Sequence, residues 1–293
     1  MICSLCPKGC NAKRDENENL TGFCKMPLQP RVARAALHFW EEPCISGTRG
    51  SGAVFFSGCS LRCVFCQNQE ISAGGFGKDI SVERLREIFD ELIARGAHNI
   101  NLVNPTHFAG AIAEALDKPL PVPVVYNSGG YDRVETLRML DGKVQVYLPD
   151  MKYAQAELGA RYARADDYPE FAKAAIQEMV RQTGPYQLDE NGMLVSGVLI
   201  RHLVLPGHLQ NSRQVIDWVA QTFAPGTVLF SLMSQYIPCG DLSHTPELNR
   251  RLTKREQDAA EDYLFAAGIE DGFVQERASA KQEYIPAFDL TGV

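Results

Sequence analysis

The sequence has few of the features that mark membrane, secreted or nucleic-acid-binding proteins. No apolar run reaches the roughly 20 residues that a membrane-spanning helix needs, and the start, MICSLCPKGC, lacks the charged-then-apolar order of a signal peptide. A net charge of -7 argues against the concentrated positive surface that binds phosphate backbones. We therefore expect a cytoplasmic protein that binds neither membranes nor nucleic acid.

Structural disulfides are not expected either, although the chain contains nine cysteines. In a reducing compartment, clustered cysteines are more often metal ligands or catalytic groups. One cluster lies at the N-terminus and another in FFSGCSLRCVFCQNQEIS, residues 55–72. Cys44 and Cys239 are single, and for each we favour a packed or loop thiol.

Short β-rich runs alternate with segments of helical period from about residue 52 onward, which predicts an α/β fold. Strands are expected at 53–57, 99–103, 123–127, 143–150, 197–207 and 227–233. Helices are expected at 81–95, 108–116, 132–140, 171–182, 212–221 and 253–267. Such apolar strands predict a parallel sheet with helices outside, either an open doubly wound sheet or a curved partial barrel. Residues 1–45, rich in Cys, Pro, Lys and Asn, form a separate segment before the main domain of 46–293.

Unusual residues follow the predicted strands, where parallel α/β folds place their chemistry. They are Cys59, Cys63 and Cys66 after the first strand, Asn104, Thr106 and His107 after the second, Asn127 and Ser128 after the third, Asp150 and Lys152 after the fourth, and Arg201 and His202 within the fifth.

The three closely spaced cysteines indicate an iron–sulfur cluster with one open iron. Soft thiolates bind zinc, copper or iron–sulfur clusters, and a closed zinc site or ordinary cubane takes four protein ligands. Cys59, Cys63 and Cys66 supply three, so a [4Fe-4S] cluster bound to them keeps one iron free for another molecule. Three incidental cysteines, or three that share zinc with a distant residue, are the weaker alternative.

The CxxxCxxC spacing after a first strand, with the aromatic Phe65 before the third cysteine, resembles the radical S-adenosylmethionine superfamily. The resemblance implies that S-adenosylmethionine chelates the open iron and that Phe65 lies against its adenine. It also implies that one electron from the cluster cleaves the carbon–sulfur bond, giving a 5′-deoxyadenosyl radical that abstracts hydrogen from a substrate. Cys59, Cys63 and Cys66 would then be the catalytic and metal-binding residues.

Within that superfamily, GCSLRCVFCQN and the chain length are most similar to the activating enzymes of glycyl radical enzymes, in particular those like pyruvate formate-lyase activating enzyme. Over 45–290 this implies a partial (β/α)6 barrel, open to a partner protein whose glycine loses the hydrogen. It also implies contacts to S-adenosylmethionine from Asn127 and Ser128 in YNSGG, Asp150 and Lys152 in DMK, and Arg201 and His202 in RHLVLPG. A tight turn, a strand-end ion pair and a hydrogen-bonded strand histidine are the structural alternatives for these three motifs.

The second strand end departs from the pattern of the activating enzymes. Many of them place Gly-Gly-Glu there to receive the methionyl ammonium, but this chain has VNPTH at 103–107. Asn104 and Thr106 would supply neutral acceptors instead, joined by His107 if its ring is unprotonated. This change keeps two other functions open, a radical enzyme that modifies a small molecule, a peptide or another protein, and a metal-binding scaffold without catalysis.

A second set of cysteines, Cys3, Cys6, Cys10 and Cys24, has the pattern CxxCxxxCx13C in a polar segment too small for a core. A closed four-thiolate site would supply the folding free energy of this segment. Zinc and an auxiliary [4Fe-4S] cluster are equal alternatives there. Every catalytic interpretation also requires a low-potential electron donor, flavodoxin or ferredoxin, and implies sensitivity to air.

Overall fold

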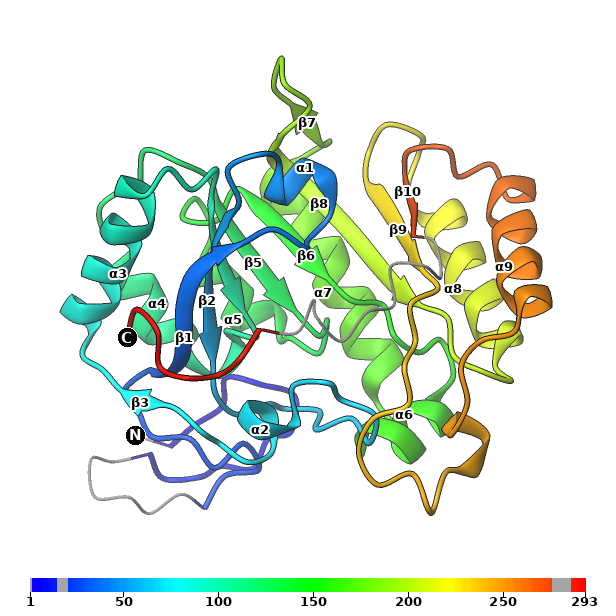
Figure 1. Cartoon of the computed structure of the whole chain (residues 1–293), viewed down its shortest axis with the longest axis horizontal. Helices are drawn as coiled ribbons and strands as arrows, with labels where there is room; N and C mark the ends of the chain where they lie inside the picture. The colour runs from blue at the N-terminus through cyan, green and yellow to red at the C-terminus, as the bar shows by residue number, and fades with distance from the viewer. Residues whose placement is uncertain (1, 15–20, 276–285) are drawn as a thin grey trace.

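The computed structural model describes residues 2–14, 21–275 and 286–293, which form one mixed sheet covered by helices (Figure 1). Its parallel strands in these residues are β2 (Ser51–Phe56), β4 (Ile100–Val103), β5 (Val124–Ser128), β6 (Val146–Pro149), β8 (Leu194–Leu203), β9 (Leu229–Met233) and β10 (Gly272–Gln275). Three antiparallel additions complete it: β1 (Arg31–His38) on β2, β3 (Lys78–Asp79) on β1 and β7 (Gln187–Leu188) on β8.

The order of the strands decides between the two predicted arrangements. Across the sheet it is β10-β9-β8-β6-β5-β4-β2-β1-β3, so the parallel strands follow one another in chain order. A doubly wound sheet reverses direction at a switch point, whereas right-handed crossovers that all advance one way place every helix on the same face. Figure 1 shows the helices that connect the parallel strands outside a curved sheet. The predicted α/β class and partial barrel are therefore confirmed, and β10 adds a seventh parallel strand that the sequence pattern did not predict.

The helices lie close to their predicted ranges. They are α3 (Val82–Ala94), α4 (Ala109–Ala115), α5 (Val134–Arg138), α7 (Tyr168–Thr183), α8 (Leu209–Thr222) and α9 (Lys254–Ala266). Three more were not predicted, α1 (Pro43–Ser46), α2 (Gln69–Ser72) and α6 (Ala156–Ala163). The predicted cap of α3 is present, because the hydroxyl of Ser81 accepts a 3.2 Å hydrogen bond from the amide of Arg84. Among the described residues, none of these helices is both long and apolar enough to traverse a bilayer.

Alternation along the strands separates an outer and an inner face of the sheet. Outer-face side chains such as Tyr126 and Phe230 join the main core under the helices. Inner-face side chains such as Val125 and Leu199 pack instead with Ile45 of α1. The side-chain amide of Asn99, which directly precedes β4, donates to the carbonyl of Ile45 at 2.7 Å. α1 therefore covers the inner face near the starts of the strands.

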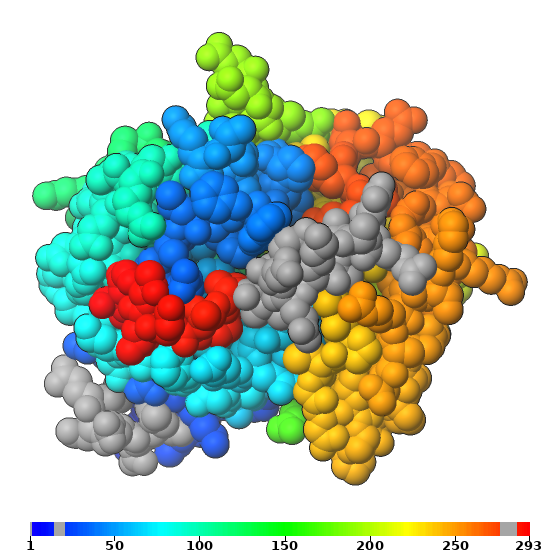
Figure 2. Space-filling model, viewed as in Figure 1, coloured from blue at the N-terminus to red at the C-terminus, as the bar shows by residue number. Residues whose placement is uncertain are grey.

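The segment that precedes β2 is integrated with the barrel. Residues 31–38, inside the predicted segment of 1–45, form β1 and pair with β2. The C-terminal residues 286–293 lie against β1 (Figure 2), where the Leu290 amide donates to the carbonyl of Ala33 at 3.0 Å and the Ala35 amide to the carbonyl of Thr291 at 2.8 Å. These bonds cover backbone groups that would otherwise be open for pairing with another chain.

Candidate cluster site and the polar network beside it

The three cysteines of the CxxxCxxC motif lie in the loop that follows β2, at the carboxyl edge of the sheet; residues 57–68 are called the cluster loop below. The amide of Leu61 donates to Cys59 Sγ at 3.3 Å, and the hydroxyl of Ser72 donates to Cys66 Sγ at 3.4 Å. Donors aimed at sulfur favour the thiolate, which is the form that binds metal. The donor set thus fits an iron–sulfur cluster.

Cys63 lies near side chains that follow β6. Burial raises the pKa of its thiol to about 12, and the nearby Lys152 acts in the opposite direction. The hydroxyl of Tyr153 lies 4.0 Å from Cys63 Sγ. A thiol this buried ionises only beside a strong positive charge, which bound iron would supply. In the part of the chain that the structure describes, no three His, Cys, Asp or Glu side chains are placed as ligands of one metal ion.

Residues after β4 hold the start of the cluster loop. Asn104 has a left-handed backbone conformation, with φ of 59°, and its side-chain amide donates to the carbonyl of Gly58. His107 Nε2 lies 2.6 Å from the carbonyl of Ser57 and therefore carries the proton that this bond needs. Burial lowers the pKa of His107 to about 3, so the ring is neutral. The sequence VNPTH thus supports the turn from which the cysteines follow.

Thr106 and Ser128 share one partner that the sequence interpretation missed. Both hydroxyls donate to the carboxylate of Asp132, at 2.7 and 2.6 Å, and the hydroxyl of Tyr126 donates to it at 2.9 Å. Burial raises the pKa of Asp132, and these three bonds oppose the rise. The two hydroxyls therefore hold the ends of β4 and β5 together through one buried carboxyl group. The available signal was an acidic residue two positions after the glycine turn of YNSGGYD.

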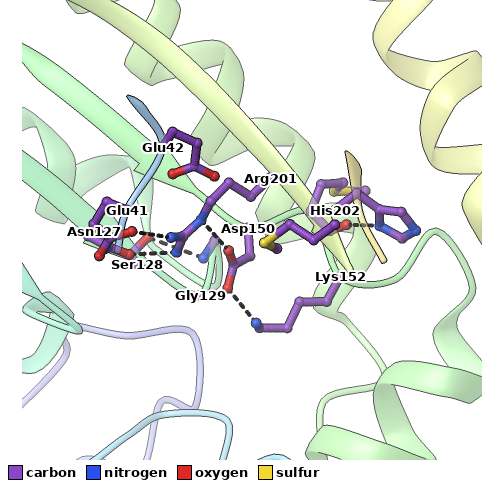
Figure 3. Close-up of polar contacts among 12 residues, drawn as sticks. Glu41, Glu42, Asn127, Ser128, Gly129, Asp150, Lys152, Arg201 and His202 are labelled. Carbon is purple, nitrogen blue, oxygen red and sulfur yellow. Dashed lines mark hydrogen bonds and ion pairs between the residues drawn. The ribbon is translucent and has the colours of Figure 1, made fainter. Parts of the chain in front are cut away.

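Arg201 is the centre of a polar network on the inner face (Figure 3). Its Nε donates to Asp150 Oδ1 at 2.9 Å, its Nη1 to Glu41 Oε2 at 3.0 Å and its Nη2 to Asn127 Oδ1 at 2.7 Å. Lys152 Nζ pairs with the other oxygen of Asp150. The structure therefore brings together Asn127 of β5, Asp150 and Lys152 after β6, and Arg201 of β8.

Two further members of this network, Glu41 and Glu42, come from the loop between β1 and α1, and the sequence interpretation missed both. Glu41 Oε1 accepts from the side-chain amides of Asn127 at 3.0 Å and Asn101 at 3.2 Å. Glu42 is 2% exposed, and one of its oxygens lies 3.4 Å from Gln275 Nε2. The only signal was a pair of adjacent carboxylates before an apolar turn, EEPCIS, in a segment that composition set apart from the barrel.

The charges of the network hold one another ionised. Burial alone would raise the pKa of Asp150, but Arg201 and Lys152 lower it below its ordinary value. Burial opposes the charged form of Lys152 as well, and Asp150 and Cys63 raise the pKa of its ammonium above the ordinary value. Because Lys152 interacts with both Asp150 and Cys63, the network reaches from the inner face to the cluster loop.

His202 lies on the opposite face of β8 from Arg201, since neighbouring strand residues point to opposite sides. Its Nδ1 lies 2.7 Å from the carbonyl of Met151, and its Nε2 lies 2.9 Å from the hydroxyl of Ser212 on α8. These contacts join β8 to α8, and the structure does not bring His202 into the network.

Phe65 lies in the cluster loop with its ring edge-on to Tyr162 and Tyr236 at centroid distances of 6.3 and 5.6 Å.

The placement of His202 predicts a pH dependence of stability. Burial lowers its pKa to about 4. Between about pH 4 and pH 6.5, His202 is therefore protonated in the unfolded chain but neutral in the native protein. The contribution of the neutral His202 ring to the free energy of unfolding is fully present above about pH 6.5. It is lost as the pH falls toward 4, an effect on the order of 3 kcal/mol. The variant His202→Asn keeps a donor for the carbonyl of Met151. In urea titrations at a series of pH values, its free energy of unfolding should therefore decline less over this range than that of the wild type. His244→Asn, at an exposed position, should follow the wild type, and a wild-type slope in His202→Asn would contradict the prediction.

The N-terminal cysteines gather close to the cluster loop. Burial raises the pKa of Cys6 to about 12, and Cys24, Cys3 and Cys10 are near enough to raise it too. A Cβ on Gly22 would lie 3.5 Å from Cys10 Sγ and 4.0 Å from Cys24 Sγ. The segment is fastened to the barrel by Arg133, whose Nε donates to the carbonyl of Cys6 at 3.0 Å.

Two links join this segment to the cluster loop. Burial lowers the pKa of Lys8, and both Cys6 and Cys59 are close enough to raise it. Met26, two residues after Cys24, packs directly against Gly58. A Cβ atom at position 58 would lie only 2.3 Å from Met26 Cγ. Gly58 has φ of 82°, so glycine is favoured there by both conformation and space.

Residues 46–114 match the family model described as a 4Fe-4S single cluster domain, and this stretch contains Cys59, Cys63 and Cys66. A relative from Methanocaldococcus jannaschii, the uncharacterized protein MJ0674, is 31% identical over 272 residues, which cover 88% of this chain and 72% of the relative.

Two solved structures are more distant. One is Streptococcus suis SuiB bound to precursor peptide SuiA, with 11% identity and a TM-score of 0.49 over 75% of this chain and 46% of SuiB. The other is a mutant of spore photoproduct lyase with a dinucleoside spore photoproduct, with 10% identity and a TM-score of 0.47 over 75% of this chain and 74% of the lyase. The chain thus spans less than half of SuiB, and similarity at this level assigns no function to it.

Proposed function

This chain belongs to the same family as the M. jannaschii protein MJ0674, and we propose that it is a radical S-adenosylmethionine enzyme. The observation that carries the proposal is the CxxxCxxC loop, which lies within the 4Fe-4S single cluster domain and at the carboxyl edge of the barrel, beside the network of Arg201. When bound, a [4Fe-4S] cluster with one open iron supplies the electron that converts S-adenosylmethionine to methionine and a 5′-deoxyadenosyl radical.

The chain's own residues would bind and orient S-adenosylmethionine. Arg201 is held by Asp150 and Glu41 and offers a fixed guanidinium to the methionyl carboxylate. Lys152 and Asn127 lie beside it and can reach the polar groups of the ribose or methionine. Phe65, between Tyr162 and Tyr236, supplies an aromatic surface for the adenine.

The test is an anaerobic assay of the reconstituted protein with dithionite and S-adenosylmethionine. Formation of 5′-deoxyadenosine is expected. A protein with a full complement of iron that forms none, across reductants that include flavodoxin and ferredoxin, would contradict the proposal. The same comparison identifies the electron donor, which we propose to be one of these two proteins.

For the substrate, the resemblance of GCSLRCVFCQN favours a glycine in a partner glycyl radical enzyme. Co-expression with such partners should then give a glycyl radical in electron paramagnetic resonance spectra, and its absence with every partner would count against this target. The second candidate is a small molecule, a peptide or another protein. One observation favours it, because Glu41 and Glu42 place two carboxylates on the inner face of the barrel.

We also propose that Cys3, Cys6, Cys10 and Cys24 bind a second metal centre, either zinc or an auxiliary cluster. Their mutual proximity and their contacts with the barrel support this. Replacing Cys6 by serine should remove that centre while iron at the cluster loop remains, and should lower the melting temperature because metal binding supplies folding free energy. Metal analysis of Cys6→Ser beside the wild type checks this, and an unchanged metal content would refute the second centre.

A further inference from the structure

We propose that the inner face of the barrel holds a subsite for a primary ammonium group of the substrate, built around Glu41 and Glu42. This inference rests on the proposed function, since it names the class of substrate that meets the radical. It draws on three features of the described residues: their balance of charge, their unpartnered oxygens and their burial.

The balance of charge is negative. Glu41, Glu42 and Asp150 contribute three carboxylates, against one guanidinium from Arg201 and one ammonium from Lys152. With all five ionised, the formal charge is -3 + 2 = -1. The side chains of Glu41 and Arg201 are only 12% and 14% exposed, so water does little to screen this excess.

The unpartnered atoms are mostly acceptors. Among the described residues, Glu42 Oε2, Asn101 Oδ1 and Gln275 Oε1 are buried and lack a hydrogen-bond partner. The orientation of both amides follows from their contacts, because Asn101 Nδ2 donates to Glu41 and Gln275 Nε2 to Glu42. Buried acceptors without donors are costly. Acceptors of this kind suit an ammonium group, which has three donors and no acceptor.

A hydroxyl completes the subsite. Ser231 of β9 is fully buried, its Oγ has no hydrogen-bond partner within 3.5 Å among the described residues, and its hydroxyl acts as a more distant hydrogen-bond donor that lowers the pKa of Glu42. Burial raises the pKa of Glu42, and Arg201 opposes the rise. A bound ammonium would add a second favourable charge and keep Glu42 ionised.

The ammonium group can come from a free amine or from the lysine side chain of a peptide or protein, and one titration series separates them. Anaerobic calorimetry on the reconstituted full chain with S-adenosylmethionine would use cadaverine, Nα-acetyl-L-lysinamide and a pentapeptide with a central lysine, blocked at both ends. Nα-acetyl-L-norleucinamide and the matching blocked norleucine peptide are the counterparts without an ammonium group. An ammonium probe should bind, and its neutral counterpart should bind at least about tenfold more weakly.

Variants locate the binding. Glu42→Gln should weaken the ammonium probe at least about tenfold, whereas Glu114→Gln, on the exposed side of α4, should match the wild type. Gln275→Leu, at a partly exposed position, should also weaken binding and serves if Glu42→Gln fails to fold. The proposal is overturned if no ammonium probe binds, if the neutral counterpart binds equally well, or if the folded variants bind as the wild type does. These titrations need no electron, so their result is independent of whether 5′-deoxyadenosine forms.

Discussion

Replacing Cys63 by alanine is expected to abolish the formation of 5′-deoxyadenosine, with a loss of more than about 10³-fold, as when one member of a catalytic unit is removed. The cluster loop provides three thiols, and Cys63 is the one that approaches both Lys152 and Tyr153. Without it, two cysteines are left to hold the iron–sulfur cluster. The assay is anaerobic quantification of 5′-deoxyadenosine, with iron and sulfide measured on the same samples.

Cys44→Ala is the matched control for this experiment. Cys44 is buried on α1, near the starts of the strands, and packs with Ile45 rather than with the cluster loop. The same loss of a thiol there should leave both iron content and product close to wild type. Product from Cys63→Ala within about tenfold of the wild type, a difference of only about 1.4 kcal/mol in barrier, would mean that the cluster loop is not the site of reductive cleavage.

The fold was largely predictable because its signals are local. Each parallel strand from β2 to β9 is a short apolar run, and Ser81 and Thr253 mark the starts of α3 and α9 with cap residues. β10 was missed because Gly272–Gln275 is a short, partly exposed edge strand that forms only by pairing with β9. Such a strand carries little periodicity of its own.

The site was predictable only in part, because its contacts are distant in sequence. The spacing of the three cysteines could be seen directly, and Asp150, Lys152 and Arg201 were found by resemblance. Glu41 could not be identified from the sequence, because its partner Arg201 lies 160 positions away in the chain. His202 shows the opposite limit, because a motif does not reveal which of two adjacent strand residues faces inward.

Replacing Arg201 by methionine is expected to lower the free energy of unfolding by about 3–5 kcal/mol, the cost of leaving buried charges without their partner. Its guanidinium bonds to Glu41, Asp150 and Asn127, and methionine fills similar volume without any donor. Arg84→Met is the control, because its partner Glu91 is 54% exposed and exposed pairs contribute about 1 kcal/mol or less. Urea denaturation of the three proteins at neutral pH measures the difference.

Adding Glu41→Gln to Arg201→Met should restore part of the lost stability, because it removes one of the stranded charges. The cost of Arg201→Met should also shrink as the pH falls below about 4, since the carboxyl groups then take up protons. In the wild type, burial raises the pKa of Asp150, but the larger opposing effect of Arg201 and Lys152 leaves this pKa below its ordinary value. The ionised Asp150 therefore stabilises the fold above the ordinary carboxyl pKa, and this stabilisation is lost on acidification. If the two proteins instead lose stability in parallel between pH 7 and 3, and the double variant is no more stable than Arg201→Met, the paired charges do not explain the role of Arg201.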